Sequence, residues 1–175
     1  MHRNVIFIGG IHGVGKGTIC SKISHELNMK HLSSSEVLKW SEISPTENNK
    51  LVKDIPETQN RLIKELSKLL KPEENYILDG HFCLFDSSEK IIPVDIQTFI
   101  KISPIIISVV TCNPKTIIKR LEKRDKKKYE LPLIEKFQNT EINQGKLVSA
   151  KLEIPFIQLN DDISELVETI NYLRK

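Results

Sequence analysis

The sequence predicts a three-layer α/β domain, in which helices cover both faces of a parallel β-sheet. Four continuous apolar runs suit strands that are buried on both faces. They are Asn4 to Gly9, Tyr76 to Leu78, Ile105 to Thr111 and Pro155 to Leu159. Segments with helical spacing separate these runs, and such alternation implies parallel pairing through right-handed crossovers. Because ligands of these domains bind at the carboxyl ends of the strands, we expect chemically active residues directly after strands.

Helices are predicted from the spacing of apolar residues and from residues that cap helix ends. After the first strand, Ile19, Ile23 and Leu27 recur every four residues, as one face of a helix requires. Capping boxes, first-turn prolines and apolar faces mark the others. These are a short helix opened by Ser33 and Glu36, one from about Pro56 to Leu70, one begun by Asn113 and Pro114, one over much of Leu131 to Lys151, and a last one capped by Asp162 and Glu165. The segments 43–50 and 86–95 are predicted to be irregular loops.

Composition indicates one globular domain over residues 1–175, with 39% hydrophobic and 28% charged residues. No run approaches the roughly 20 apolar residues of a membrane span, and Val5 to Ile8 is too short for the core of a signal peptide. The cysteines, Cys20, Cys83 and Cys112, are far apart and odd in number, which suggests neither a disulfide framework nor a zinc site. We therefore expect a cytoplasmic protein with no membrane partner.

Net charge gives little support to a nucleic-acid partner. The formal net charge is +3, too small for a field that would gather nucleic acid non-specifically. The positive charge is uneven, because Lys119 to Lys128 contains seven basic and two acidic residues. This segment is either a solvated basic face or a contact for an anionic ligand.

The glycines are concentrated in the turn after the first strand. Five of the seven lie within residues 9–18, which read Gly-Gly-Ile-His-Gly-Val-Gly-Lys-Gly-Thr. Backbone amides can converge on phosphate oxygens in such a turn, and the following helix adds the positive end of its dipole. The alternative, a glycine-rich turn without a ligand, fits this strand and helix context poorly. The residues expected to bind the nucleotide are Gly13, Val14, Gly15, Lys16, Gly17 and Thr18.

Two side chains of this loop have predicted roles. Lys16 is expected to reach the β- and γ-phosphates of ATP, and Thr18 to help hold Mg²⁺. Gly17 occupies the position where Ser or Thr usually follows the lysine, so the hydroxyl arrives one residue later. Asp79 ends an apolar strand and is a second candidate for the metal; its alternative is a simple Asp-Gly turn.

Several motifs resemble the adenylate kinases in the same order along the chain. Gly-x-Gly-Lys-Gly-Thr is the form of the loop in that family, and Leu32 to Lys39 resembles its monophosphate-binding segment. Ile77 to Gly80 resembles the strand end that carries its magnesium-associated aspartate. Arg120 and Arg124 resemble the arginine pair that flanks its lid. Residues 53–66 together with Asp-Gly-His at 79–81 look most like archaeal-type adenylate kinases and related small AAA-labelled nucleotide kinases.

This resemblance implies a P-loop NTPase fold with a five-stranded parallel sheet in the order 2-3-1-4-5. It also implies an acceptor-binding helical region at 33–60, a short lid at 120–130, and γ-phosphoryl transfer from Mg-ATP to a nucleoside monophosphate. Lys16, Arg120 and Arg124 would be catalytic, and Arg120 would also contact the nucleotide. The alternative for both arginines is a solvated basic face.

The acceptor side departs from the family pattern. Ser35 stands where the family has glycine, Lys39 replaces an arginine, and no arginine follows residues 79–82. Lysine is a point charge and binds phosphate with less directionality than arginine. The residues expected to contact the acceptor are Ser34, Lys39, Gln59 and His81, each with a surface or structural role as its alternative.

Two other functions remain compatible with the sequence. The same donor site could serve another small acceptor, such as a nucleoside or a sugar, and the missing arginines favour that reading. Alternatively, slow ATP hydrolysis could switch a binding module with a protein or RNA partner, for which the basic segment Lys119 to Lys128 would be suited.

Overall fold

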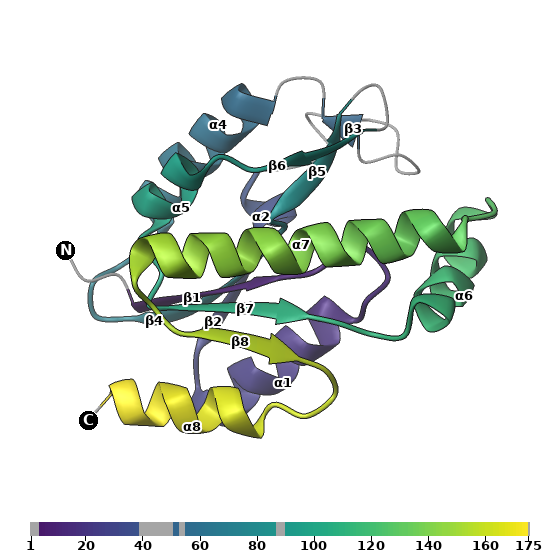
Figure 1. Cartoon of the computed structure of the whole chain (residues 1–175). Coiled ribbons are helices and arrows are strands. Elements are labelled where there is room, and N and C mark those ends of the chain that lie inside the picture. Colours follow the sequence, from purple (N-terminus) through teal and green to yellow (C-terminus); the bar gives the residue numbers. More distant parts are fainter. Residues whose placement is uncertain (1–3, 39–50, 53–54, 87–89, 175) are drawn as a thin grey trace.

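The computed structural model describes residues 4–38, 51–52, 55–86 and 90–174. Its centre is a parallel sheet of five strands in the order β2-β4-β1-β7-β8 (Figure 1). Counted among themselves along the chain, these strands have the order 2-3-1-4-5, as expected. Their bounds are β1 Asn4–Gly9, β2 Lys30–Ser33, β4 Asn75–Asp79, β7 Ile106–Val110 and β8 Phe156–Leu159.

Helices cover both faces of this sheet, as the three-layer prediction requires. The helices α1 and α8 lie on one face, and α7, α4 and α5 lie on the other (Figure 1). The helix α6 lies beyond the carboxyl end of β7 and packs against α7. The bounds are α1 Lys16–Leu27, α2 Ser34–Val37, α4 Ile55–Leu69, α5 Ile96–Ile102, α6 Pro114–Asp125, α7 Leu131–Leu152 and α8 Ser164–Leu173.

A second, three-stranded sheet lies beside α4 and α5 and was not predicted. It has the order β3-β5-β6, from Leu51–Val52, Cys83–Asp86 and Ile91–Pro93. The expectation of one irregular loop over residues 86–95 was therefore wrong for β6, which pairs antiparallel with β5. Runs of three or four residues are too short to show an apolar period, so strand pairing, a tertiary property, decides them.

The cap at Asn113 was predicted correctly, while the two capping boxes were not. The Asn113 side chain accepts a hydrogen bond from the Lys115 amide at 2.9 Å, and a proline opens α6. Ser33 precedes α2 without a side-chain cap, because its hydroxyl lies 2.8 Å from that of Ser35. The Asp162 side chain accepts a hydrogen bond from the amide of Ser164. The N-cap of α8 is Ile163, however, and the helix begins at Ser164, two residues after Asp162.

Three phenylalanines form the core where the two sheets approach each other. The ring centroids of Phe7, Phe82 and Phe99 lie 4.9 to 5.2 Å apart, in edge and stacked arrangements that favour aromatic pairs. Phe7 comes from β1, Phe99 from α5, and Phe82 from the corner between β4 and β5. This cluster fixes the position of the corner that follows Asp79.

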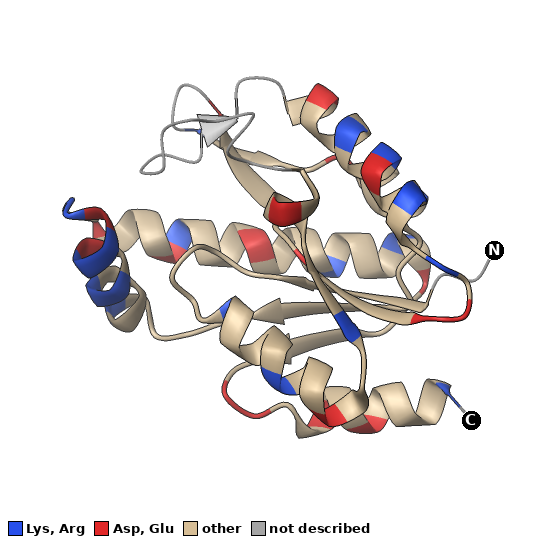
Figure 2. Cartoon of the chain, turned by 180° about the vertical axis from the view of Figure 1, so that it is seen from behind, with Lys and Arg blue, Asp and Glu red and all other residues tan. Residues whose placement is uncertain are grey.

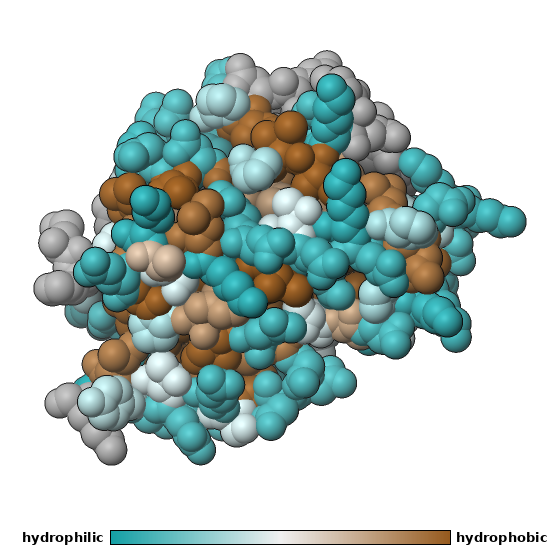
Figure 3. All heavy atoms as spheres, in the orientation of Figure 1, coloured by the Kyte–Doolittle hydropathy of each residue, from teal (hydrophilic) through white to brown (hydrophobic). Residues whose placement is uncertain are grey.

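The surface is mostly hydrophilic along α7. A band of hydrophilic side chains crosses the middle of the face in Figure 3, where α7 lies, and apolar residues gather above it toward α5 and β6. Within the described part of the chain, we find no helix that is both long enough and apolar enough to span a membrane.

Candidate functional site

The loop between β1 and α1 has a backbone that requires glycine. Gly13 and Gly15 have φ of +80° and +102°, in the left-handed region that side chains disfavour. A Cβ on Gly13 would lie 2.9 Å from Cγ of Leu121. Gly15 is the N-cap of α1 and provides no side-chain cap, so the first amides of this helix remain available to an anion.

Gly17, the departure from the usual motif, is not required by packing. A Cβ at this position would meet no atom within 4 Å among the described residues. The absence of a hydroxyl at position 17 is therefore a feature of this sequence and not a steric necessity, and Thr18 supplies the first hydroxyl of α1.

Arg120 is bound to the loop. Its Nη1 donates to the carbonyl oxygens of Gly13 and Val14 at 3.2 and 3.0 Å. The guanidinium thus reaches from α6 to one rim of an open depression, which we call the loop hollow. Its lining consists of Ile11, His12, Gly13, Gly15, Lys16, Gly17, Thr18, Ile19 and Arg120.

Arg124 lies one turn later and is engaged elsewhere. Its Nη2 donates to Asp125 at 2.7 Å, and the Tyr129 hydroxyl donates to the same carboxylate. The hydrogen bond from Arg124 lowers the pKa of Asp125. The predicted contact of Arg124 with substrate stays a prediction, because this side chain is not part of the lining of the loop hollow.

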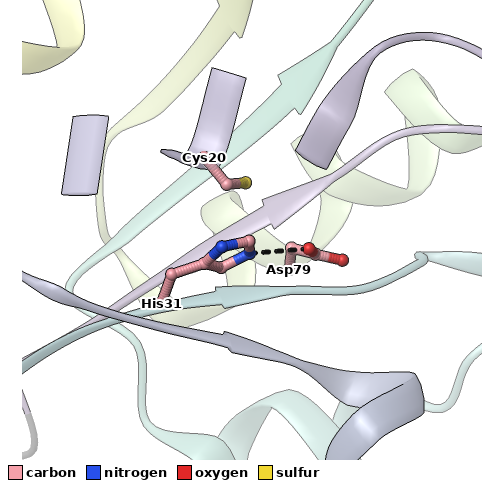
Figure 4. Close-up of side chains that lie close together, drawn as sticks. All are labelled: Cys20, His31 and Asp79. Atoms are coloured by element: carbon pink, nitrogen blue, oxygen red, sulfur yellow. Dashed lines mark hydrogen bonds and ion pairs between the residues drawn. The ribbon is translucent and has the colours of Figure 1, made fainter. Parts of the chain in front are cut away.

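Asp79 lies between two basic side chains at the end of β4. His31 Nε2 is 2.8 Å from its Oδ2, and Lys16 Nζ is 3.8 Å from its Oδ1. Figure 4 shows His31 pointing at the carboxylate, with the Cys20 side chain nearby. These contacts orient the carboxylate toward the loop, where a hard cation with oxygen ligands could be held.

Cys20, His31 and Asp79 offer three potential metal-ligand atoms within 4.8 Å of one another (Figure 4). Burial raises the pKa of the Cys20 thiol to about 12, so it is protonated near neutral pH and a poor ligand for Mg²⁺. His31 is a site residue that no sequence motif indicated. Its contact with Asp79 depends on the pairing of β2 with β4, which sets Ser33 opposite Asp79 and is a tertiary feature.

A second depression adjoins the loop hollow, and we call it the serine pocket. The structure brings the predicted acceptor residues Ser34, Gln59 and His81 into its lining, whereas Lys39 lies outside the described residues. Its other lining residues are Phe7, His12, Lys16, Ser33, Ser35, Leu38, Thr58, Leu62, Asp79, Gly80, Leu84, Thr98, Phe99 and Ile102.

The serine pocket has many polar side chains but few basic ones. Lys16 is the only lysine or arginine in its described lining. The Ser34 hydroxyl is buried and has no hydrogen-bond partner among the described residues. Gly80 permits its position, because a Cβ there would lie 2.8 Å from the Ser34 hydroxyl oxygen. A donor and acceptor group without a partner in a pocket is suited to a ligand.

The two depressions share Lys16 and His12. His12 comes from the loop and His81 from the β4–β5 corner, and their ring centroids are 4.3 Å apart. A ligand in the loop hollow and another in the serine pocket would therefore meet beside Lys16.

Glu141 is a further residue of the site that no sequence motif indicated. It lies on α7 with 0% of its surface exposed, and its carboxylate accepts hydrogen bonds from the amides of Gly10, Phe82 and Cys83. Burial raises its pKa to about 7, against the opposing effect of these hydrogen bonds. The sequence does hold an indication of its burial, because this acidic residue is in line with the apolar face of α7, where Ile134 and Phe137 are also buried.

Comparisons with known proteins agree with this architecture. The family model described as AAA domain matches residues 9–138, more than half of the chain. The adenylate kinase of Borrelia garinii subsp. bavariensis is 29% identical over 132 residues, covering 69% of this chain and 57% of that protein. Mouse adenylate kinase isoenzyme 5 is 33% identical over 86 residues, covering 44% and 15% of the two chains. The chain thus matches little more than half the length of the Borrelia adenylate kinase.

Solved structures show a similar fold at low identity. The YorR protein of Bacillus subtilis, in complex with phosphorylated GDP, has a TM-score of 0.57 at 17% identity, covering 97% of this chain and 96% of that one. A gluconokinase from Sinorhizobium meliloti 1021 has a TM-score of 0.54 at 9% identity, covering 96% and 89%. The glycine loop, the parallel sheet and the family match lead to one conclusion: the chain belongs to the AAA domain family and resembles the adenylate kinases.

Proposed function

We propose that this chain is a magnesium-dependent phosphotransferase that moves the γ-phosphoryl group of ATP to a nucleoside monophosphate. The main observation in support of this proposal is that the loop hollow and the serine pocket meet at Lys16 and His12. Phosphoryl transfer requires mainly that donor and acceptor be held in line while negative charge is neutralised. Two adjoining sites with a lysine between them suit that task.

For the donor, we assign the loop hollow. The residues proposed to hold the nucleotide phosphates are Gly13, Val14, Gly15, Lys16, Gly17 and Thr18. The uncapped amides at the start of α1 and the glycines that keep the backbone accessible fit a phosphate chain. Lys16 would neutralise charge on the transferred group. Arg120, already at the rim of the hollow, would contact the same nucleotide.

For Mg²⁺, we propose the Thr18 hydroxyl and the Asp79 carboxylate. Oxygen ligands are those that Mg²⁺ prefers, and the hydrogen bond with His31 fits Asp79 for the role by fixing its orientation. The ion would supply charge neutralisation at the phosphates.

For the acceptor, we assign the serine pocket. Ser34, Gln59 and His81 are proposed to contact the acceptor, with apolar walls such as Phe99 and Leu62 suited to a base or another flat group. Lys39 stays a prediction. A phosphate acceptor is already ionised near neutral pH, so no general base is needed.

We further propose that residues 33–60 form the acceptor-binding region and that residues 120–130 form a short lid, within one P-loop kinase domain. The basic residues of α6 lie at one end of the molecule (Figure 2). Arg120 and Arg124 would close over the reacting phosphates and keep water from hydrolysing ATP.

A second candidate keeps the donor and changes the acceptor to a small molecule that presents a hydroxyl group. The observation that favours it is the low positive charge of the serine pocket, whose only described lysine or arginine is Lys16. An acceptor phosphate is usually held by more cationic groups than one.

The deciding assay offers Mg-ATP with a panel of nucleoside monophosphates, nucleosides and sugars, and follows ADP together with the phosphorylated product. Product formation that requires a monophosphate supports the proposal, and product only from hydroxyl acceptors supports the second candidate. ADP formation that no acceptor changes would indicate a nucleotide-switched ATPase with a protein or RNA partner instead.

Lys16→Ala should reduce turnover by about 100-fold or more, because it removes a cation from the transition state. Lys22→Ala is the matched control, since Lys22 is an exposed residue of the same helix. Equal turnover in the two variants would contradict the assignment of the donor site.

A further inference from the structure

We propose that Glu141 is a positioning residue that holds the loop hollow and the wall of the serine pocket in one fixed relation. The inference rests on the proposed function only in its kinetic consequence. The structural link itself can be tested without any acceptor.

The carboxylate of Glu141 joins two segments that are distant in sequence. Oε1 accepts from the amides of Gly10 and Phe82, both at 2.9 Å, and Oε2 accepts from Cys83 at 2.7 Å. Gly10 opens the glycine loop, whereas Phe82 and Cys83 directly follow the corner that carries Asp79 and His81. Movement of one segment relative to the other would break at least one of these hydrogen bonds.

An ionised carboxylate suits this position better than any other side chain. It only accepts hydrogen bonds, and here it meets three backbone donors that are buried with it. The amide of a glutamine would turn two N–H bonds of its own toward one of these donors. One buried N–H group would then lose its partner, which is unfavourable where the surroundings are buried.

The packing of α7 shows why the carboxylate can reach this far. Gly145 lies one turn after Glu141, and a Cβ there would be 2.8 Å from Cγ2 of Val109 on β7. The absence of a side chain lets α7 approach the sheet closely. Gly9 leaves room for the Phe82 ring, because a Cβ there would overlap that ring.

The charge of Glu141 is balanced near neutral pH. Burial favours the protonated form, and the hydrogen-bonding amides and the Lys16 ammonium favour the ionised form, which together leave the pKa at about 7. The titratable groups that face it are the His81 ring, with Nδ1 at 3.8 Å from Oε1, and the Cys83 thiol. Burial raises the pKa of that thiol, so it stays protonated at this pH. Protonation of Glu141 would remove one acceptor site and loosen the link.

The kinetic experiment compares Glu141→Gln with Glu135→Gln, an exposed residue of the same helix. In Glu141→Gln we expect kcat to fall by about 10- to 100-fold through misalignment of the reacting groups, with the Kd for Mg-ATP within about threefold of wild type. Wild-type kcat should decline below about pH 7, and this limb should be absent in Glu141→Gln. Wild-type kcat in Glu141→Gln, or a retained acid limb, would overturn the proposal.

A measurement on the wild-type chain decides the matter even if Glu141→Gln does not fold. In ¹H–¹⁵N spectra recorded across pH, the amide signals of Gly10, Phe82 and Cys83 should shift together with one midpoint. The exposed Glu135 amide serves as the reference. Three unrelated midpoints, or none, would overturn the link. If these amides titrate together while no acceptor is phosphorylated, the proposed function fails and the structural role of Glu141 stands.

Discussion

Glu141 shows how one residue can serve a site at the expense of stability. Transfer of a carboxylate from water to a fully buried position is unfavourable, and three backbone hydrogen bonds offset only part of that cost. An apolar side chain of similar volume would leave the three amides without acceptors. Replacing Glu141 and ionising Glu141 are therefore both unfavourable for the stability of the folded state.

The raised pKa of Glu141 makes a prediction about stability. Its pKa in the folded state, about 7, lies above the ordinary value of 4.5, so the folded state binds the proton more tightly. The resulting stabilisation is fully present below pH 4.5 and is lost as the pH rises through 7. Glu141→Gln lacks this titration. We expect the wild-type free energy of unfolding, relative to Glu141→Gln, to fall by on the order of 3 kcal/mol between these limits.

Urea unfolding of both proteins across that pH range measures this difference. A difference that does not change with pH would show that Glu141 has an ordinary pKa. Glu135→Gln provides the reference for an exposed carboxyl on α7, where the same substitution should leave the pH dependence of unfolding unchanged.

At the scale of elements, the distance between α7 and the sheet determines whether Glu141 reaches its partners. Gly145→Ala should force α7 away from β7, because the added Cβ would lie 2.8 Å from Val109 and 3.2 Å from Phe156. We expect a loss of about 1–3 kcal/mol in the free energy of unfolding, as is typical of overpacked cores. Denaturant titration is the measurement.

Gly17→Ala is the matched comparison for that substitution. Gly17 lies in the first turn of α1 with open space around its Cβ position. The same change there should leave stability unchanged or raise it by up to about 1 kcal/mol, because alanine loses less backbone entropy in a helix. Equal effects of the two alanines would show that close packing of α7 is not what Gly145 provides.

At the scale of the whole molecule, the loop hollow links segments from across the sequence, since the loop after β1, the helix α1 and the helix α6 all contribute to it. A ligand that binds only the folded state stabilises all of them together. Mg-ATP at about 100 times its Kd should add roughly 2.7 kcal/mol, which corresponds to about 5–10 °C in Tm for a chain of this size. Differential scanning fluorimetry with and without nucleotide measures the shift.

The shift should nearly disappear in Lys16→Ala and persist in Lys22→Ala. An undiminished shift in Lys16→Ala would mean that the nucleotide binds away from the loop hollow. Removal of Mg²⁺ with a chelator should reduce the shift, because Thr18 and Asp79 would then contribute no metal bridge to the phosphates.

The local features of this protein can be predicted from neighbouring residues alone. Continuous apolar runs predicted four strands of the sheet, and Asn113 with Pro114 predicted the start of α6, because burial period and cap chemistry are written in neighbouring residues. Clustered glycines likewise located the loop around Lys16, since an unusual backbone needs them wherever it occurs.

Contacts between groups far apart in the sequence depend on the folded chain as a whole. Glu141 contacts Gly10, 131 residues away, and His31 contacts Asp79, 48 residues away. The sheet β3-β5-β6 and the sharing of Lys16 by two depressions belong to the same class. Neighbouring residues do not specify such contacts. The contacts follow from the order of the strands and from the close packing of α7 on the sheet, and both exist only in the folded chain.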